Sequence, residues 1–168
     1  GRGEVIDTEQ LLDMHRQGLD CQLVLDVWEN EPLVPLALLE RCLFGTAHIA
    51  GYSTDGKRRA TRMLFDACVE SLQMNVSAGC DDGGSALAVE VTGDLHGAQL
   101  IRFLMLQIYD IAEDDRLLRQ TVPGSFDGLR KSYRSRRELQ LLQISNFDDL
   151  SPAQQQLCSA LGCGAARC

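Results

Sequence analysis

The sequence predicts an α/β fold with parallel strands, followed by a smaller α+β domain. Short apolar runs alternate with amphipathic helical segments along the first half of the chain, which is the order typical of a parallel sheet with right-handed crossovers. Hydrophobic residues make up 45% and charged residues 24% of the 168 residues, a composition that suffices for an ordinary globular core.

The first half predicts a regular alternation of elements. In order, we expect a helix (7–18), a strand buried on both faces (21–28), one or two helical turns (35–42), a second strand with its exit loop (43–51) and a long helix (53–74). Asp7 or Thr8 can cap the first helix, and Gly18 ends it. The long helix carries one apolar stripe: Ala60, Met63, Leu64, Ala67, Cys68 and Leu72.

Near Asn75 the sequence becomes polar and glycine-rich, which predicts a linker over residues 76–84 between a domain at 1–75 and a domain at 85–168. The second domain should contain a strand (86–93), a helix (97–120), a basic helix (125–140), a strand (139–145) and a capped helix (151–162). Its apolar stripes have little to cover them, so we expect a symmetric homodimer through residues after about Ser85. One such stripe is formed by Ile101, Leu104, Met105 and Ile108.

Charge and cysteine content exclude several functions. The net charge of −8 argues against nucleic-acid binding, because a binder neutralises phosphates with a basic face. The seven cysteines are odd in number and match no zinc spacing, so we expect reduced thiols and no metal. Neither a targeting peptide nor an apolar run of about 18 residues is present in this sequence, so a cytoplasmic location is expected.

Ionisable residues stand at the ends of the two predicted strands. Asp26 lies where the first strand exits, and His48 where the second does, with Glu31 on the loop between them. Arg2 lies where a preceding strand would have ended. Because ligands bind outside the carboxyl ends of parallel strands, these four side chains would line one rim.

This set of side chains suits one reaction. A histidine hydrogen-bonded to a carboxylate can exchange a proton with a hydroxyl, and an arginine can orient a substrate carboxylate. Together they fit interconversion of a 2-hydroxy acid and a 2-keto acid, with the hydride passing to a cofactor. Other roles remain open: Asp26 as a loop cap, Glu31 as a solvated loop residue, His48 as a core histidine and Arg2 as an ordinary chain end.

The segments "GRGEVID", "LVLDVWENEP" and "HIAG" together resemble the signature of the D-isomer-specific 2-hydroxyacid dehydrogenases in order and spacing. The resemblance implies the C-terminal part of a Rossmann-type NAD-binding domain at 1–75. In that family Arg2 would orient the substrate, His48 would donate or accept the proton, and Glu31 would be its carboxylate partner. Asp26 would contact the nicotinamide end of NAD, and the Gly1–Arg2 backbone would help to hold the cofactor.

One branch of that family, which acts on a phosphorylated 2-hydroxy acid, resembles the chain more closely. The similarity extends through "HIAGYSTDGKRRATR", "IYDIAEDDRLLR" and "PGSFDGLRKSYRSRRE". In this branch Gly51 would contact NAD, Tyr52 would contact the substrate, and the additional C-terminal domain would serve dimerisation.

The family's glycine-rich phosphate loop is not found in this sequence. We therefore expect the C-terminal part of a longer enzyme, inactive as an isolated fragment. The alternatives are a dehydrogenase for another 2-hydroxy acid, or a binding or assembly module that kept the fold without the chemistry. Two basic clusters, either solvated helix faces or phosphate ligands, remain unassigned: Lys57, Arg58, Arg59 and Arg62, and Arg130, Lys131, Arg134, Arg136 and Arg137.

Overall fold

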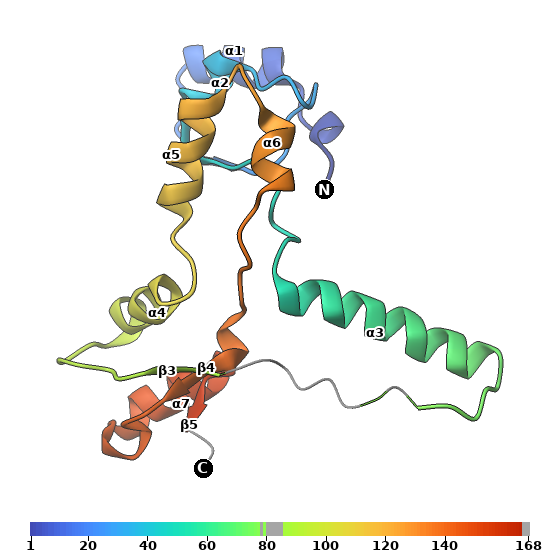
Figure 1. The fold of residues 1–168 in the computed structure, drawn as a ribbon. Helices are drawn as coiled ribbons and strands as arrows, with labels where there is room; N and C mark the ends of the chain where they lie inside the picture. The colour runs from blue at the N-terminus through green and yellow to red at the C-terminus, as the bar shows by residue number, and fades with distance from the viewer. Residues whose placement is uncertain (78, 80–85, 166–168) are drawn as a thin grey trace. The chain divides into compact units, whose positions relative to one another are not determined.

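The computed structural model describes residues 1–77, 79 and 86–165 (Figure 1). The chain forms two compact units whose segments alternate along the sequence. Unit 1 consists of Gly1–Gly51 and Asp110–Arg134, and unit 2 of Tyr52–Tyr109 and Ser135–Cys168. The linker predicted at 76–84 lies mostly outside the described residues, so the predicted domain boundaries at 75 and 85 stay a prediction.

Unit 1 is built on one pair of parallel strands. Its elements are η1 (Gly3–Val5), α1 (Thr8–Arg16), β1 (Leu23–Leu25), α2 (Leu36–Leu39), β2 (Cys42–Gly45), α5 (Ile111–Thr121) and α6 (Phe126–Lys131). Asp7 caps α1 as expected, because its side chain accepts a hydrogen bond from the amide of Gln10. The strands β1 and β2 pair in parallel, and the amide of Thr46 extends the ladder by donating to the carbonyl of Leu25 at 2.9 Å.

The core of unit 1 joins the first fifty residues to the two later helices. Trp28 is 1% exposed, and Leu38, Leu118 and Phe126 are equally well buried. Helix α5 packs on β2 (Figure 1). Burying each side chain of this kind contributes roughly 1.5–3 kcal/mol to folding. We expected the first strand to be buried on both faces, but one face of β1 is open, since Val24 in its middle is 54% exposed.

Unit 2 also contains parallel strands. Its elements are α3 (Thr54–Ser71), β3 (Leu87–Val89), α4 (Gly97–Leu106), η2 (Leu139–Leu141), β4 (Leu142–Ile144), η3 (Phe147–Asp149), α7 (Pro152–Ala160) and β5 (Gly164–Ala165). The strand order is β3-β4-β5, and both pairs are parallel. Helices α4 and α7 contribute to the core around these strands: Val89, Val91, Leu100, Leu104, Leu142, Ile144, Leu150, Cys158 and Cys163. The predicted α/β class is therefore confirmed, with parallel strands in both units.

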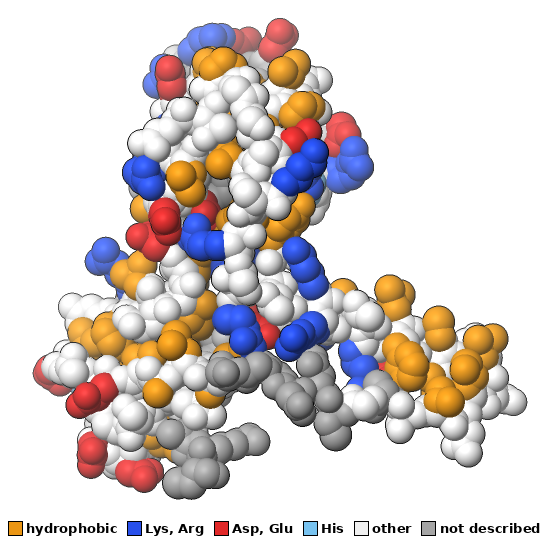
Figure 2. Space-filling view, in the orientation of Figure 1, with side chains coloured by type: hydrophobic (Ala, Val, Ile, Leu, Met, Phe, Trp, Pro, Cys, Tyr) orange, Lys and Arg blue, Asp and Glu red, His pale blue; other side chains and the backbone are white. Residues whose placement is uncertain are grey.

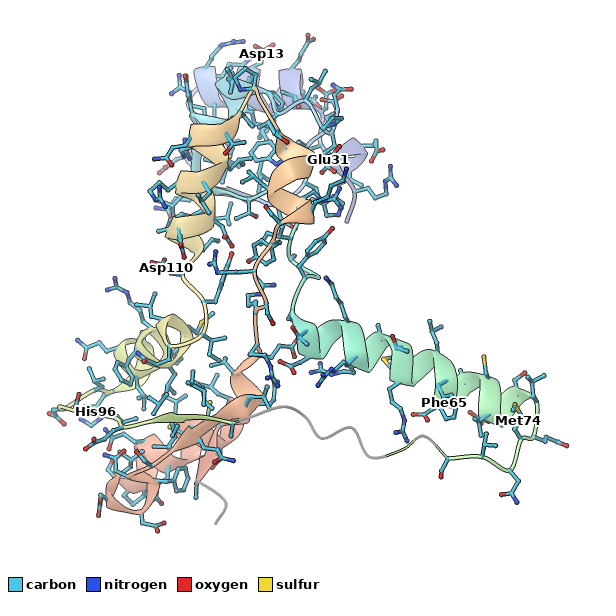
Figure 3. The ribbon with its side chains drawn as sticks, in the orientation of Figure 1. Asp13, Glu31, Phe65, Met74, His96 and Asp110 are labelled. Atoms are coloured by element: carbon cyan, nitrogen blue, oxygen red, sulfur yellow. The ribbon has the colours of Figure 1, made fainter. Side chains whose placement is uncertain are left out.

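Helix α3 spans nearly the whole predicted range, but its apolar stripe is uncovered. Ser53 caps the helix by accepting from the amide of Gly56. No residue of α3 is buried, and Met63 and Leu64 are 66% and 70% exposed. Apolar side chains gather over the second half of this helix in Figure 2, and Figure 3 labels Phe65 on the helix and Met74 just after its end. The apolar stripe predicted from the sequence is therefore exposed in the structure.

The single helix predicted at 97–120 is two helices that belong to different units. Helix α4 ends at Leu106, and α5 begins after Asp110, which Figure 3 labels at that point. The side chain of Asp110 accepts from the amide of Ala112, and Glu113 and Asp114 follow in the first turn. An aspartate cap followed by acidic residues is a helix start, so the break was readable in the sequence.

The basic helix predicted at 125–140 is also shorter than expected, because α6 ends at Lys131. The residues that follow are drawn into an extended segment beside the start of α3. The carbonyl of Arg136 accepts from the amide of Thr54 at 2.8 Å, and Asp55 pairs with Arg137 and accepts from the amide of Glu138. Burial raises the pKa of Asp55, but these hydrogen bonds outweigh burial and leave the pKa lowered. Tertiary hydrogen bonds thus override the helical propensity of the segment.

Within the described residues, no helix combines the length and apolar character needed to cross a bilayer. The described cysteines Cys21, Cys42, Cys68, Cys158 and Cys163 are free thiols, as expected, while Cys80 and Cys168 lie outside the described residues.

The buried and the exposed cysteines should differ sharply in their rates of alkylation. Cys42 and Cys163 are buried, and burial raises the pKa of each to about 11, whereas Cys21 and Cys68 are exposed. At pH 8 a thiol with that pKa is only about 0.1% thiolate, the form that reacts. We expect mass spectrometry after iodoacetamide treatment to find Cys21 and Cys68 modified and the buried pair intact until urea is added. Equal rates for Cys42 and Cys68 in native buffer would contradict this.

Candidate active site

A histidine and a carboxylate form a hydrogen-bonded pair on unit 1. Nδ1 of His48 lies 2.8 Å from Oε2 of Glu31, and the other oxygen of Glu31 accepts from the amide of Trp28 at 3.0 Å. The two side chains are 34% and 22% exposed, so the pair is partly desolvated but reachable. Since Glu31 holds Nδ1, the neutral ring carries its proton there and presents the lone pair of Nε2.

The backbone places His48 in an unusual conformation. His48 follows β2 with φ of 55°, in the left-handed region that non-glycine residues seldom adopt. Asp26 holds the loop in this shape. Its Oδ1 accepts from the hydroxyl of Thr46 at 2.6 Å and from the amide of Ile49 at 2.7 Å, and its Oδ2 accepts from the amide of Ala50 at 2.9 Å. Such strain persists only where the surroundings determine it, as three hydrogen bonds do here.

Trp28 ties the two loops together from inside the core. Its Nε1 donates to the carbonyl of Thr46 at 2.9 Å, two residues before His48, while its amide donates to Glu31. One buried residue therefore contacts both sides of the histidine–carboxylate pair. Neither Trp28 nor Thr46 was predicted as a site residue. Their signal was their position, directly beside the ionisable residues at the ends of the strands.

The start of the chain packs against the same loop. Gly3 is buried, and a Cβ at this position would lie 1.9 Å from the carbonyl oxygen of Trp28, so only glycine fits. Arg2 is exposed and pairs with Glu4 at 2.7 Å. Its hydrogen bond to Glu4 raises the pKa of Arg2, and the charge of Glu31 adds to this. The charge of Glu31 thus acts on Arg2, while the place of Arg2 on one rim with Glu31 and His48 stays a prediction.

The predicted cofactor residues divide into two kinds. Gly1 and Gly51 are exposed, and a Cβ built on either would meet nothing within 4 Å, which leaves room for a ligand beside the backbone. Asp26 instead commits both oxygens to its own loop. Tyr52 belongs to unit 2, where Nζ of Lys57 lies 4.2 Å from the centroid of its ring. The assigned roles of these residues in binding NAD and substrate stay predictions.

Several members of the two basic clusters are paired with carboxylates. Arg59 contacts Glu138 at 2.6 Å, Arg134 contacts Asp114 at 2.9 Å, and Arg137 contacts Asp55 at 3.1 Å. These pairs favour a structural role for those three arginines. Among the described residues, no group of three or more histidine, cysteine or acidic side chains could hold a metal ion.

Comparison with known proteins identifies the relatives of this chain. Residues 85–162 match the family model described as "Domain of unknown function (DUF3410)". The chain is 39% identical over 96% of its length to the erythronate-4-phosphate dehydrogenase of Psychromonas ingrahamii, and 41% identical over 96% to that of Edwardsiella ictaluri. The chain is a relative of the erythronate-4-phosphate dehydrogenases. It spans 42% and 44% of those two proteins, less than half their length.

The enzyme from Pseudomonas fluorescens is a third such relative, 39% identical over 96% of this chain and with 45% of its own length covered. The predicted resemblance is therefore confirmed, and it extends over nearly the whole chain. The relatives are dehydrogenases by name, which agrees with the chemistry inferred from Arg2, Glu31 and His48.

Removing the charge of Asp26 should loosen the loop that carries His48. In Asp26→Asn, one oxygen becomes an NH₂ group that faces an amide or hydroxyl donor, so we expect a loss of about 1–3 kcal/mol in the free energy of unfolding. Asp20→Asn, an exposed aspartate before the same strand, should change this free energy by less than about 0.5 kcal/mol. Urea titrations of the two variants test the difference, and equal unfolding midpoints would show that the hydrogen bonds of Asp26 contribute nothing.

Proposed function

We propose that the chain supplies the acid–base part of the active site of an NAD-dependent 4-phosphoerythronate dehydrogenase. This enzyme would oxidise the 2-hydroxyl of 4-phospho-D-erythronate to the 2-oxo acid, in the biosynthesis of pyridoxal 5′-phosphate (vitamin B6). The observation that carries the proposal is the 2.8 Å hydrogen bond between Nδ1 of His48 and Glu31. The names of the relatives, which specify erythronate 4-phosphate, support the choice of substrate.

His48 would act as the proton acceptor in the oxidation. Its Nε2 lone pair takes the proton of the 2-hydroxyl, and the ring becomes an imidazolium. The carboxylate of Glu31, already at Nδ1, stabilises that positive charge and keeps the ring oriented. In the reverse direction the same nitrogen returns the proton to the carbonyl oxygen. The pair thus transfers one proton in either direction without moving another group.

Arg2 would bind the carboxylate of the substrate. Its guanidinium is exposed and always charged, and its two donors already match the spacing of a carboxylate in the pair with Glu4. A substrate carboxylate could take the place of Glu4 at this fork. The substrate's 2-hydroxyl would then be fixed relative to the guanidinium.

NAD fits the open backbone on unit 1 and supplies, when bound, the acceptor for the hydride that no side chain can take. Gly1, Arg2 and Gly51 would hold it, because both glycines leave space for a flat ring. Asp26 would act on the nicotinamide end chiefly through the loop that it shapes, since its oxygens already accept three hydrogen bonds.

Two other functions compete with this one: oxidation of a different 2-hydroxy acid by the same chemistry, and a binding or assembly role without chemistry. The second is disfavoured by the orientation of Glu31: one oxygen holds the histidine, and the other accepts from the amide of Trp28, which fixes the carboxylate toward the ring. A module without catalysis has no need of a histidine held in a strained backbone conformation.

Kinetics on a polypeptide of the relatives' length that carries these residues test the proposal. His48→Asn should lower turnover by roughly 10²–10⁴, the usual contribution of general acid–base catalysis, with little change in NAD affinity. His96→Asn is the matched control, because His96 also contacts a carboxylate (Asp94, 2.7 Å) but lies exposed on unit 2. Similar turnover in both variants would show that His48 is not the proton acceptor.

The same protein distinguishes between the candidate substrates. We expect a higher specificity constant for 4-phosphoerythronate than for unphosphorylated erythronate. Equal constants would remove the phosphorylated substrate from the proposal and leave a 2-hydroxyacid dehydrogenase of broader specificity.

We also propose that the protein is a symmetric homodimer through residues after about Ser85. The proposal rests on the apolar stripe of α4 that includes Leu104 and Met105. Leu104 is buried in the core of unit 2, while Met105 is 45% exposed and could contact a partner subunit. Sedimentation at tens of micromolar should give twice the monomer mass, and a monomer would contradict the proposal. Met105→Asp should weaken the dimer, since a charge would then lie in an apolar interface.

A further inference from the structure

Helices α5 and α6 pack, within unit 1, against the strand that leads to His48. Both helices lie inside the 85–162 segment that matches the domain of unknown function, whereas β2 and His48 lie outside it. The expected role for this segment was dimerisation. The contacts of α5 with β2 point to a second role that concerns the histidine.

Side chains of α5 bond directly to the backbone of β2. The amide of Gly45 donates to Oδ1 of Asp115 at 2.7 Å, and the carbonyl of Cys42 accepts from Nη2 of Arg119 at 3.0 Å. Arg119 and Asp115 also pair with each other, with Nε at 3.0 and 2.9 Å from the two carboxylate oxygens. The hydrogen bond to Asp115 raises the pKa of Arg119, so the guanidinium stays charged. These contacts hold β2 at both ends. The end at Gly45 lies three residues before His48.

A second group of contacts lies behind the histidine. Ala47 and Ile49, the neighbours of His48, are buried and line a cavity of about 170 Å³. The opposite wall includes Asp114 and Tyr133 from the α5 and α6 segments. Asp114 is 6% exposed, and it accepts from the hydroxyl of Tyr133 at 2.7 Å and from Nη1 of Arg134 at 2.9 Å. Tyr133 and Arg134, which follow α6, are thereby fixed against α5, and they face Ala47 and Ile49 across the cavity.

We propose that Asp115, Arg119 and Tyr133 are positioning residues for proton transfer by His48. The inference rests on the proposed function and adds to it a role for the domain of unknown function. Asp26 fixes the loop from the β1 side, and α5 with α6 fixes it from the other. Because His48 adopts a strained backbone conformation, loss of either support lets the ring move away from the substrate's hydroxyl. A displacement near 1 Å can cost up to about 10²-fold in rate.

A matched pair of substitutions on α5 separates this role from general stabilisation. Arg119→Met breaks the contacts to Asp115 and Cys42, whereas Arg116→Met on the same helix breaks only an exposed contact to Gln120. In a polypeptide of the relatives' length, we expect Arg119→Met to lower kcat at least about fivefold, with KM for NAD changed less than about twofold. Arg116→Met should retain both constants.

A second variant and a second measurement guard against misfolding. Tyr133→Phe removes one hydroxyl and keeps the ring, and it should lower kcat in the same direction as Arg119→Met. The ¹⁵N chemical shifts of the His48 ring report its tautomer. In both variants they should move toward the values of a mixture of the Nδ1–H and Nε2–H tautomers, because the bond to Glu31 loosens. They should not shift in Arg116→Met. A purely structural role would lower the unfolding midpoint and leave these shifts unchanged.

The outcomes distinguish the inference from the function on which it rests. If His48→Asn abolishes turnover while Arg119→Met and Tyr133→Phe keep kcat and the ¹⁵N shifts of the wild type, the positioning role is wrong and the function stands. If His48→Asn keeps turnover, the proposed function fails. The ring shifts in Arg119→Met and Tyr133→Phe then still decide whether α5 and α6 orient His48.

Discussion

The carboxylate of Asp26 organises unit 1 around the candidate site. It accepts three hydrogen bonds from residues 46–50, and these bonds hold a turn that leaves His48 with a positive φ. The position of the ring, its bond to Glu31 and the packing of Ala47 and Ile49 all depend on that turn. A single short side chain at the end of β1 thus determines where the residue at the end of β2 can act. Parallel strands make this possible because they bring their carboxyl ends to the same edge.

The carboxylates of Asp26 and Glu31 have different roles, although the two residues are only five positions apart in the sequence. Glu31 faces the ring of His48 and can respond to its charge, while Asp26 faces amides and a hydroxyl whose charge never changes. The first arrangement suits a group that takes part in proton transfer, and the second suits a fixed support. Trp28 holds the loops after β1 and β2 together, because it is buried and its amide donates to Glu31 while its Nε1 donates to the carbonyl of Thr46.

Much of the site was predictable because it consists of residues close to strand ends. The placement of Asp26, Glu31 and His48 followed from two apolar runs and the geometry of parallel sheets, and Asp7 followed from its capping position. The interleaving of the units was not predictable, because α5 packs on β2 through contacts about 70 residues apart in sequence. The length of α6 was misjudged for a related reason: residues 135–138 have helical propensity, but the start of α3 binds their backbone. The amide of Thr54 donates to the carbonyl of Arg136, and the carboxylate of Asp55 accepts from the amide of Glu138. Local patterns report local preference, and these features depend on distant partners.

The alternation of segments between the two units has a consequence for how the chain is made and inherited. During synthesis, residues 1–51 cannot complete their core until residues 110–134 have left the ribosome, because Leu118 and Phe126 belong to that core. All of α3 and the first strand of unit 2 emerge in the meantime, and their partners in unit 2 follow only from residue 135 on. A genetic exchange with a single crossover inside the chain would separate parts of at least one unit. Loss of the domain of unknown function would therefore also remove α5 and α6 from the core beside β2, the strand that precedes His48.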